Sequence, residues 1–391
     1  HQSGRRQRQM CIRDRSTSEI SRFCNLNDQS WITAVIPLSK TPADAEPLTG
    51  FRRFFHESVL TLKLGIPVVI AQILLISMQF VDTVMAGHVS ARDLAALGIA
   101  TALFHPLLLL MVGVLMAVTP MVAQLKGSQK DDRMSKVVAD ALQLSLVFAL
   151  PLILLLHLLE PLMEFIGYPE EVSRIGDGYL QAVAWGVPAM LAYDVFRHFN
   201  EGVALTRPNM YFHTVGLMLN ILGNYTLMFG HFGFPAMGAV GAGWSTALVW
   251  NMMFLMMILF SFKNSRLRKY LKLGDFFRIH LLNTREILRI GVPNGLSTGA
   301  ETGLFALVAL MMGTLGVHVM AAHQIAINVA AMTFMVPLGI SVAITSRIGL
   351  AAGSGNDALA RYRGFSGIIL CGMVMLVPAA VYLLLPQWIV R

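Results

Sequence analysis

Nine long apolar runs, separated by short polar connections, constrain this sequence more than any other feature. An apolar run of about 20 residues crosses the hydrocarbon layer of a membrane as a helix. The runs cover residues 60–86, 94–124, 136–159, 179–205, 208–230, 238–262, 287–313, 319–349 and 364–387. We therefore expect an all-α, polytopic membrane protein whose helices form a bundle.

The composition supports this expectation. Charged residues make up 13% of the chain, whereas an average soluble domain has about 25%. The three cysteines, Cys11, Cys24 and Cys371, form neither a disulfide framework nor a metal-binding set. The sequence has no phosphate-binding loop, nucleophile elbow or HExxH motif. We therefore expect no enzyme activity and no cofactor.

Positive charge alternates from one connection to the next. Residues 126–136 and 263–289 are rich in Lys and Arg, whereas 230–238 and 313–317 contain no Lys, Arg, Asp or Glu. Short cytoplasmic loops collect Lys and Arg, so the N-terminus is expected in the cytoplasm. The net charge of +8 then requires no nucleic-acid partner.

The chain divides into four parts. Residues 1–50 lack an apolar face and are expected to be a disordered or non-native segment. An N-lobe with transmembrane helices 1–6 is expected at 51–262, a basic cytoplasmic inter-lobe loop at 263–286, and a C-lobe with helices 7–9 at 287–391.

The two lobes share an internal repeat at an offset of 226 residues. Gly65-Ile66-Pro67 corresponds to Gly291-Val292-Pro293, Thr119 to Thr345, and Gly127-Ser128 to Gly353-Ser354. Six runs lie within the offset, so both copies enter the membrane from the same side, as in the parallel repeats of secondary transporters. Completing the second copy would require twelve helices, so we expect the chain to be a fragment or a truncated gene product.

One group of polar residues is expected in the outer half of the membrane. Asp82 is the only ionisable residue in 64–86, and Asn220, Asn224 and Thr246 lie at a similar depth. Carboxylate, amide and hydroxyl oxygens suit Na⁺, and burial of Asp82 would suit a proton. Alternatively, the amides and the hydroxyl join neighbouring helices by hydrogen bonds.

A second group is expected in the C-lobe. Glu301 is the only acid in 290–317, and Gln324 and Asn328 lie one turn apart in the next run. These three residues are candidates for cation or substrate binding, and Asp82 and Glu301 are the candidate Na⁺ ligands. A protonated Glu301 at a helix interface is the alternative. Asp194, Arg197, His198 and Glu201 are spaced to neutralise one another on one helix, which indicates a structural role.

Several motifs resemble those of the bacterial NorM-type branch of the multidrug and toxic compound extrusion (MATE) transporters. They include QFVDTVMAGHV at 79–89, NILGNYTLMFG at 220–230 and AAHQIAINVAAMTFMVPLGI at 321–340. The resemblance implies a monomer of the bacterial inner membrane that exports cationic drugs or dyes by alternating access, in exchange for Na⁺ or H⁺. It also implies that Asp82 and Glu301 are the acids of the two lobes, although the family's second C-lobe acid lies on a tenth helix that this sequence lacks.

Three alternatives remain open at this stage. A lipid-linked oligosaccharide flippase of the same superfamily would be expected to carry Lys or Arg in mid-membrane, where this sequence has almost none. A channel would need a continuous polar pore, whereas most runs here hold few strongly polar residues. The chain could also be a truncated fragment that does not transport.

Overall fold

The computed structural model describes residues 50–159, 163, 169–278, 281–314 and 317–384. The described residues form helices and connections, with no β-strand. The prediction for residues 1–50 lies outside the described part except for Gly50, which begins a helix. The fold class expected from the sequence, an all-α membrane bundle, is confirmed.

The N-terminal lobe contains eight described helices, which form six segments that correspond to the first six apolar runs. Two segments consist of two helices in succession, α4–α5 and α8–α9. The helices are α3 (Gly50–Val89), α4 (Ala91–Leu115), α5 (Val118–Gly127), α6 (Asp131–His157), α8 (Glu170–Ala184), α9 (Val187–Gly202), α10 (Arg207–Leu227) and α11 (Ala239–Lys263).

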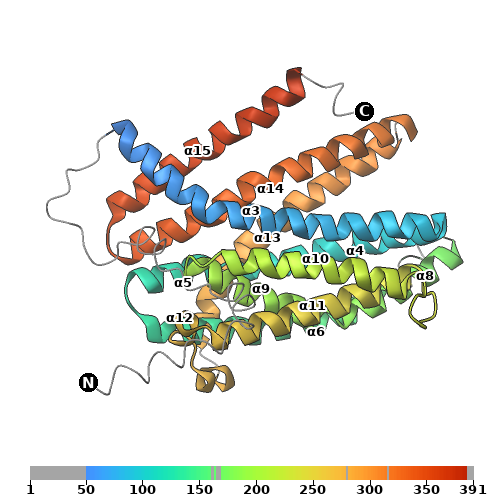
Figure 1. Cartoon of the computed structure of the whole chain (residues 1–391), viewed down its shortest axis with the longest axis horizontal. Coiled ribbons are helices and arrows are strands. Elements are labelled where there is room, and N and C mark those ends of the chain that lie inside the picture. The colour runs from blue at the N-terminus through green and yellow to red at the C-terminus, as the bar shows by residue number, and fades with distance from the viewer. Residues whose placement is uncertain (1–49, 160–162, 164–168, 279–280, 315–316, 385–391) are drawn as a thin grey trace, which may run out of the picture. The chain divides into compact units, whose positions relative to one another are not determined.

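A short linker connects this lobe to three long helices. The linker contains α12 (Ser265–Arg268) and the 3₁₀ helix η1 (Leu273–Phe277), and the three helices are α13 (Leu281–Thr314), α14 (Val317–Gly353) and α15 (Asp357–Leu384). In Figure 1, α13 and α14 lie beside α4 and α5, and α15 lies beyond α14.

The helices match the nine apolar runs, and the two longest extensions are those of α3 and α8. Helix α3 begins ten residues before the run at 60, and α8 begins at Glu170 rather than at 179. Two acids in the first turn of α8, Glu170 and Glu171, favour a helix N-terminus. Six described helical segments are long and apolar enough to cross a membrane by themselves. The segments that fall short are α8–α9, α10 and α13, because the first is interrupted and the others contain more polar residues.

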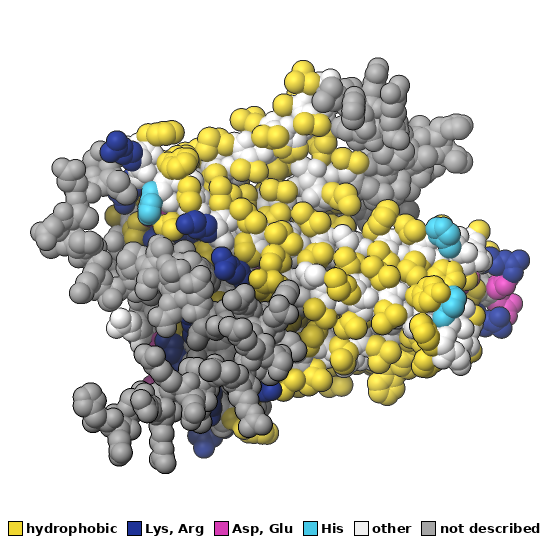
Figure 2. Space-filling model, viewed as in Figure 1, with side chains coloured by type: hydrophobic (Ala, Val, Ile, Leu, Met, Phe, Trp, Pro, Cys, Tyr) yellow, Lys and Arg dark blue, Asp and Glu magenta, His cyan; other side chains and the backbone are white. Residues whose placement is uncertain are grey.

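The best-packed core lies in the N-terminal lobe, where Tyr193, Phe196 and Phe199 of α9 are fully buried. Apolar side chains also cover the middle of the molecular surface, and Lys and Arg gather toward its ends (Figure 2). Large exposed apolar areas are expected on a protein surrounded by lipid.

The 226-residue repeat recurs in the contacts between the lobes. A Cβ atom added to Gly127 would lie 2.3 Å from the carbonyl oxygen of Leu350, and one added to Gly353 would lie 2.1 Å from that of Gln124. The repeat offset of 226 residues relates these two contacts, because Gly127 corresponds to Gly353 and Gln124 corresponds to Leu350. Gly65 against Ile340 and Gly291 against Val114 form a second such pair. An approximate two-fold axis therefore relates the two lobes where their backbones touch, and we call this contact the glycine seam.

The first part of α3 also joins the two lobes by ionic contacts. The Glu57 carboxylate accepts hydrogen bonds from Arg347 of α14 and, at 3.3 Å, from Arg363 of α15. Arg347 also donates to the hydroxyl of Thr61. Glu57 is 13% exposed and Arg347 is 6% exposed, so this is a largely buried cluster.

Candidate functional site

The structure brings Asp82 of α3 together with two amides of α10. Nδ2 of Asn220 and Nδ2 of Asn224 donate hydrogen bonds of 2.9 and 2.6 Å to the same oxygen, Oδ1 of Asp82. Asp82 is 9% exposed, and both Asn side chains are fully buried. The two amides lie one helical turn apart, which places them on the same face of α10.

Two amide oxygens in this group have no hydrogen-bond partner among the described residues. They are Oδ1 of Asn220 and Oδ1 of Asn224, and both are buried. Thr246 belongs to α11, and its hydroxyl is placed to donate a hydrogen bond to the Asp82 carboxylate. A buried polar atom without a partner costs about 1–3 kcal/mol, so the two unpaired amide oxygens beside a carboxylate make this group a candidate site for a small cation.

Asp82 also has no fixed positive partner. No ion pair joins it to Lys, Arg or His in the described part of the chain. When ionised, the site therefore holds one uncompensated negative charge in a membrane-spanning helix, which is costly in lipid. A proton or Na⁺ would neutralise it, and the oxygens supplied by Asn and Thr are the hard ligands that such cations prefer.

Tyr179 of α8 belongs to the same site, although the sequence analysis did not include it. Tyr179 is 4% exposed and packs against α11 at Gly243, three residues before Thr246. Its backbone lies so close to α11 that a Cβ atom added to Gly243 would be 2.7 Å from the Tyr179 carbonyl oxygen. The sequence offered one signal for Tyr179, which is its depth along the helix, similar to that of Asp82. Only the packing of α8 on α11 shows that Tyr179 lies near the site.

Small residues allow α10 and α11 to approach closely at this site. A Cβ atom added to Gly223 would lie 2.3 Å from Oγ of Ser245, and one added to Gly241 would lie 2.5 Å from the carbonyl oxygen of Leu227. Asn224 and Thr246 are chain neighbours of Gly223 and Ser245. The close helix contact therefore positions both of these ligands next to Asp82.

Of the three C-lobe candidates, the structure describes the side chain of Glu301. Glu301 lies on an exposed face of α13, and its neighbours Thr298 and Thr302 bond to carbonyl oxygens of their own helix. The side chains of Gln324 and Asn328 lie outside the described residues. The binding role of these three residues stays a prediction.

The charged residues of α9 pair with one another, as their spacing indicates. Nε of Arg197 donates a 2.7 Å hydrogen bond to Asp194, and its NH1 atom lies 3.6 Å from Glu201. His198 lies 3.1 Å from the other oxygen of Glu201. Since these charges are compensated locally, the cluster offers less to a mobile cation than Asp82 does.

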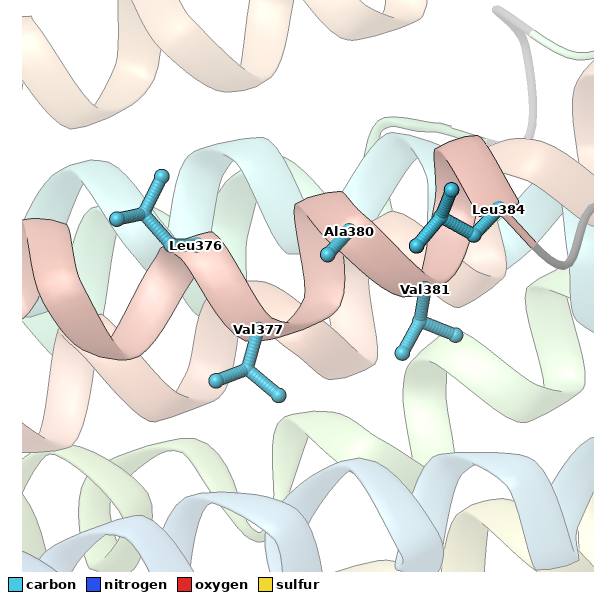
Figure 3. A pocket seen from close by; sticks show the side chains of 5 residues that line it. All are labelled: Leu376, Val377, Ala380, Val381 and Leu384. Atoms are coloured by element: carbon cyan, nitrogen blue, oxygen red, sulfur yellow. The ribbon is translucent and has the colours of Figure 1, made fainter.

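An apolar groove on α15 is a poor candidate for a functional site. Leu376, Val377, Ala380, Val381 and Leu384 line it, all from one helix (Figure 3). None of these side chains has a polar atom that could orient a ligand or hold a cation.

Comparison with known proteins gives consistent matches. The MatE family model matches residues 67–226 and 293–391. The multidrug resistance protein NorM of Photobacterium profundum is 36% identical over 326 residues, which cover 83% of this chain and 71% of that protein. NorM of Aliivibrio fischeri is 38% identical over 316 residues, covering 81% and 69%.

Solved structures agree on the fold. The eukaryotic MATE transporter AtDTX14 superposes with a TM-score of 0.76 at 17% identity, covering 84% of this chain and 73% of that one. A multidrug resistance MATE transporter in an outward-facing conformation gives a TM-score of 0.75 at 21% identity, covering 88% and 76%.

Proposed function

Because this chain belongs to the MatE family of multidrug transporters, we propose that it exports amphipathic cations by antiport against Na⁺ or H⁺. Proteins of this family are transporters rather than enzymes, and the chain is a multi-pass membrane protein. The proposal places it in a bacterial inner membrane as a monomer, with its N-terminus in the cytoplasm. Its cargo would be cationic drugs or dyes.

The uncompensated carboxylate of Asp82 is the observation that carries this proposal. It lies beside the buried amide oxygens of Asn220 and Asn224, which have no partner among the described residues, and beside the hydroxyl of Thr246. A small cation bound there would gain ligands and neutralise the charge. A cationic cargo attracted to the same carboxylate would compete with that ion, and competition for one charge is the simplest form of exchange.

The membrane potential supplies part of the driving force. A monovalent cation that moves inward gains about 2.3 kcal/mol per 100 mV. Of the two ions we favour Na⁺, because Asn224 contributes an oxygen without adding a second titratable acid. Glu301, with Gln324 and Asn328, is proposed as a further cation or cargo site.

The glycine seam supports a route for alternating access. Gly127 and Gly353 end α5 and α14. Lys130 and Arg133 follow the first glycine, and Arg361 and Arg363 follow the second. If the connections that follow both glycines are cytoplasmic, the seam closes the cytoplasmic side of the contact between the lobes. Separation of the lobes at the seam would then expose the cargo site to the cytoplasm.

Transport assays on the reconstituted chain test this proposal. Proteoliposomes would be loaded with a fluorescent cationic dye, and Na⁺ and pH gradients would be imposed separately. We expect dye movement with at least one gradient, and at least a tenfold loss in Asp82→Asn. Asp132→Asn, a matched change at an exposed acid that is 84% accessible, should transport normally. Transport that survives Asp82→Asn contradicts the coupling role, and absence of transport in the unmodified chain contradicts the function.

A further inference from the structure

The linker between the lobes does not project freely from the bundle, because hydrogen bonds hold it against α6. Oγ of Ser135 accepts a 2.8 Å hydrogen bond from the backbone nitrogen of Lys272. Further along α6, Nε2 of Gln143 donates to the carbonyl oxygens of Phe276 and Arg278, at 3.0 and 3.1 Å. The segment 272–278 therefore follows α6 from Ser135 to Gln143.

These contacts fix the depth of the linker. Eight residues separate Ser135 from Gln143, which is about 12 Å along a helix. Asp140 is the last charged residue of α6, and the helix is free of Asp, Glu, Lys and Arg from there to His157. The hydrocarbon layer thus begins close to Gln143. The linker consequently reaches the level of the lipid headgroups rather than remaining in the aqueous phase.

Two large apolar side chains of the linker are exposed along this path. Phe277 is 84% exposed, the highest value among the large apolar residues that the structure describes, and Leu273 is 65% exposed. By contrast, Leu267, Tyr270 and Leu271 of the same linker are buried. The linker thus has one face on the bundle and a second apolar face without a protein partner in the described chain.

Exposed cations accompany the outward apolar face. Arg268, Lys269 and Arg278 are all exposed. Nζ of Lys269 lies over the Tyr270 ring at 4.4 Å from its centroid, and the charge of Lys269 is close enough to act on Lys126 of α5. Concentrated positive charge beside exposed Phe and Leu matches the composition of segments that lie in an anionic membrane surface.

We propose that residues 264–278 form an anionic-lipid platform at the cytoplasmic face of the membrane. Leu273 and Phe277 enter the headgroup region, and Arg268, Lys269 and Arg278 bind the phosphates of acidic phospholipids. The platform anchors the segment through which the two lobes are covalently joined. This proposal rests on the membrane orientation given with the proposed function, and it does not depend on which cation or cargo is transported.

Labelling at Phe277 tests the depth of the platform. The full chain, with its three cysteines changed to Ser, would carry Phe277→Cys labelled with an environment-sensitive fluorophore in phosphatidylcholine vesicles containing 30% phosphatidylglycerol. Lys130→Cys is the matched control, because it lies at the start of the same helix α6, about 20 Å from Gln143. We expect a blue-shifted emission and weak iodide quenching at 277, with strong iodide quenching at 130. Leu273→Cys provides a second position if Phe277→Cys folds poorly.

Spin-labelled lipids test the lipid class in the same vesicles. Quenching at 277 by labelled phosphatidylglycerol should exceed quenching by labelled phosphatidylcholine. Replacing Arg268 and Arg278 by Gln should reduce this preference roughly fivefold per residue, as expected for about 1 kcal/mol per cation. Replacing Lys130 and Arg361 by Gln should leave it unchanged. Equal quenching by both lipids, or iodide access at 277 equal to that at 130, would overturn the proposal.

Discussion

Asn224 donates a 2.6 Å hydrogen bond to Oδ1 of Asp82, across 142 residues of sequence, and its own buried amide oxygen has no partner in the described part of the chain. An amide at this position contributes an oxygen ligand and no charge. The site as a whole can therefore hold a single negative charge, and one bound monovalent cation brings it to neutrality.

Changing Asn224 to Asp should convert the site to proton-dependent behaviour. Two carboxylates this close cannot both ionise easily, so one of them would hold a proton near neutral pH. We expect gradient-driven dye transport by Asn224→Asp to fall as pH rises between 6 and 8, more steeply than in the unmodified chain. Transport measured at several pH values with constant Na⁺ checks this. An unchanged pH profile would indicate that residue 224 does not share a site with Asp82.

Removing the hydroxyl of Tyr179 should weaken ion binding without unfolding the protein. The ring is buried against α11, so Tyr179→Phe keeps the packing and loses only an oxygen near Asp82. A hydrogen bond to a charged group contributes about 1.5–3 kcal/mol, and no such bond joins this hydroxyl to Asp82 among the described contacts. We therefore expect the ion concentration for half-maximal transport to rise by less than tenfold.

Tyr193→Phe is the control for this change. Its hydroxyl lies 3.2 Å from Nδ1 of His213, in the network of α9 and α10 rather than at Asp82. The Tyr193→Phe variant should show the same ion dependence of transport as the unmodified chain. If both variants change the ion dependence equally, the effect of Tyr179 is not specific to the site.

Adding a methyl group at the glycine seam should separate the lobes. In Gly353→Ala the new Cβ would lie 2.1 Å from the Gln124 carbonyl oxygen, and in Gly127→Ala it would lie 2.3 Å from that of Leu350. Overpacking of this kind costs about 1–3 kcal/mol. We expect both variants to lower the melting temperature and transport by similar amounts, since the two positions are related by the repeat.

Gly372→Ala serves as the matched control for the seam. A Cβ atom at Gly372 meets no atom within 4 Å, although the residue is also in a helix of the C-terminal lobe. Its melting temperature should be unchanged or slightly higher. Large differences between the Gly127 and Gly353 variants would contradict the symmetry of the contact.

Neutralising Glu57 should destabilise the protein far more than neutralising an exposed acid. In Glu57→Gln, two arginines of α14 and α15 lose the carboxylate that they share. Breaking a buried ion pair by removing one partner costs about 3–5 kcal/mol. Glu171→Gln removes the exposed pair with Arg92, which should contribute at most about 1 kcal/mol. Thermal unfolding of the two variants in the same detergent compares them directly.

The sequence predicted a large part of this arrangement because apolar length and repeat spacing are local signals. Each of the nine runs corresponds to a helix or a helix pair, and the offset of 226 recurs as paired backbone contacts. The grouping of Asp82 with Asn220 and Asn224 followed from their depth along the helices. Depth places residues at the same level but does not say which helices are neighbours.

Features that depend on helix neighbours were therefore missed. Tyr179 reaches the site only because α8 packs on α11 at Gly243. The Glu57 cluster joins residues about 290 positions apart, and no local pattern pairs an acid at the start of α3 with arginines of α14 and α15. The docking of the linker on α6 depends on Ser135 and Gln143, which look like ordinary polar residues in the sequence.

The bare backbone at the glycine seam limits how the lobes can part. No side chain there can swing aside to admit water or cargo, because the atoms in contact are main-chain atoms of whole helices. Matched contacts on both sides of the axis must also loosen together. A partly open seam through which ions could leak is therefore disfavoured. Opening of the lobes at the seam requires whole helices to move together as rigid bodies.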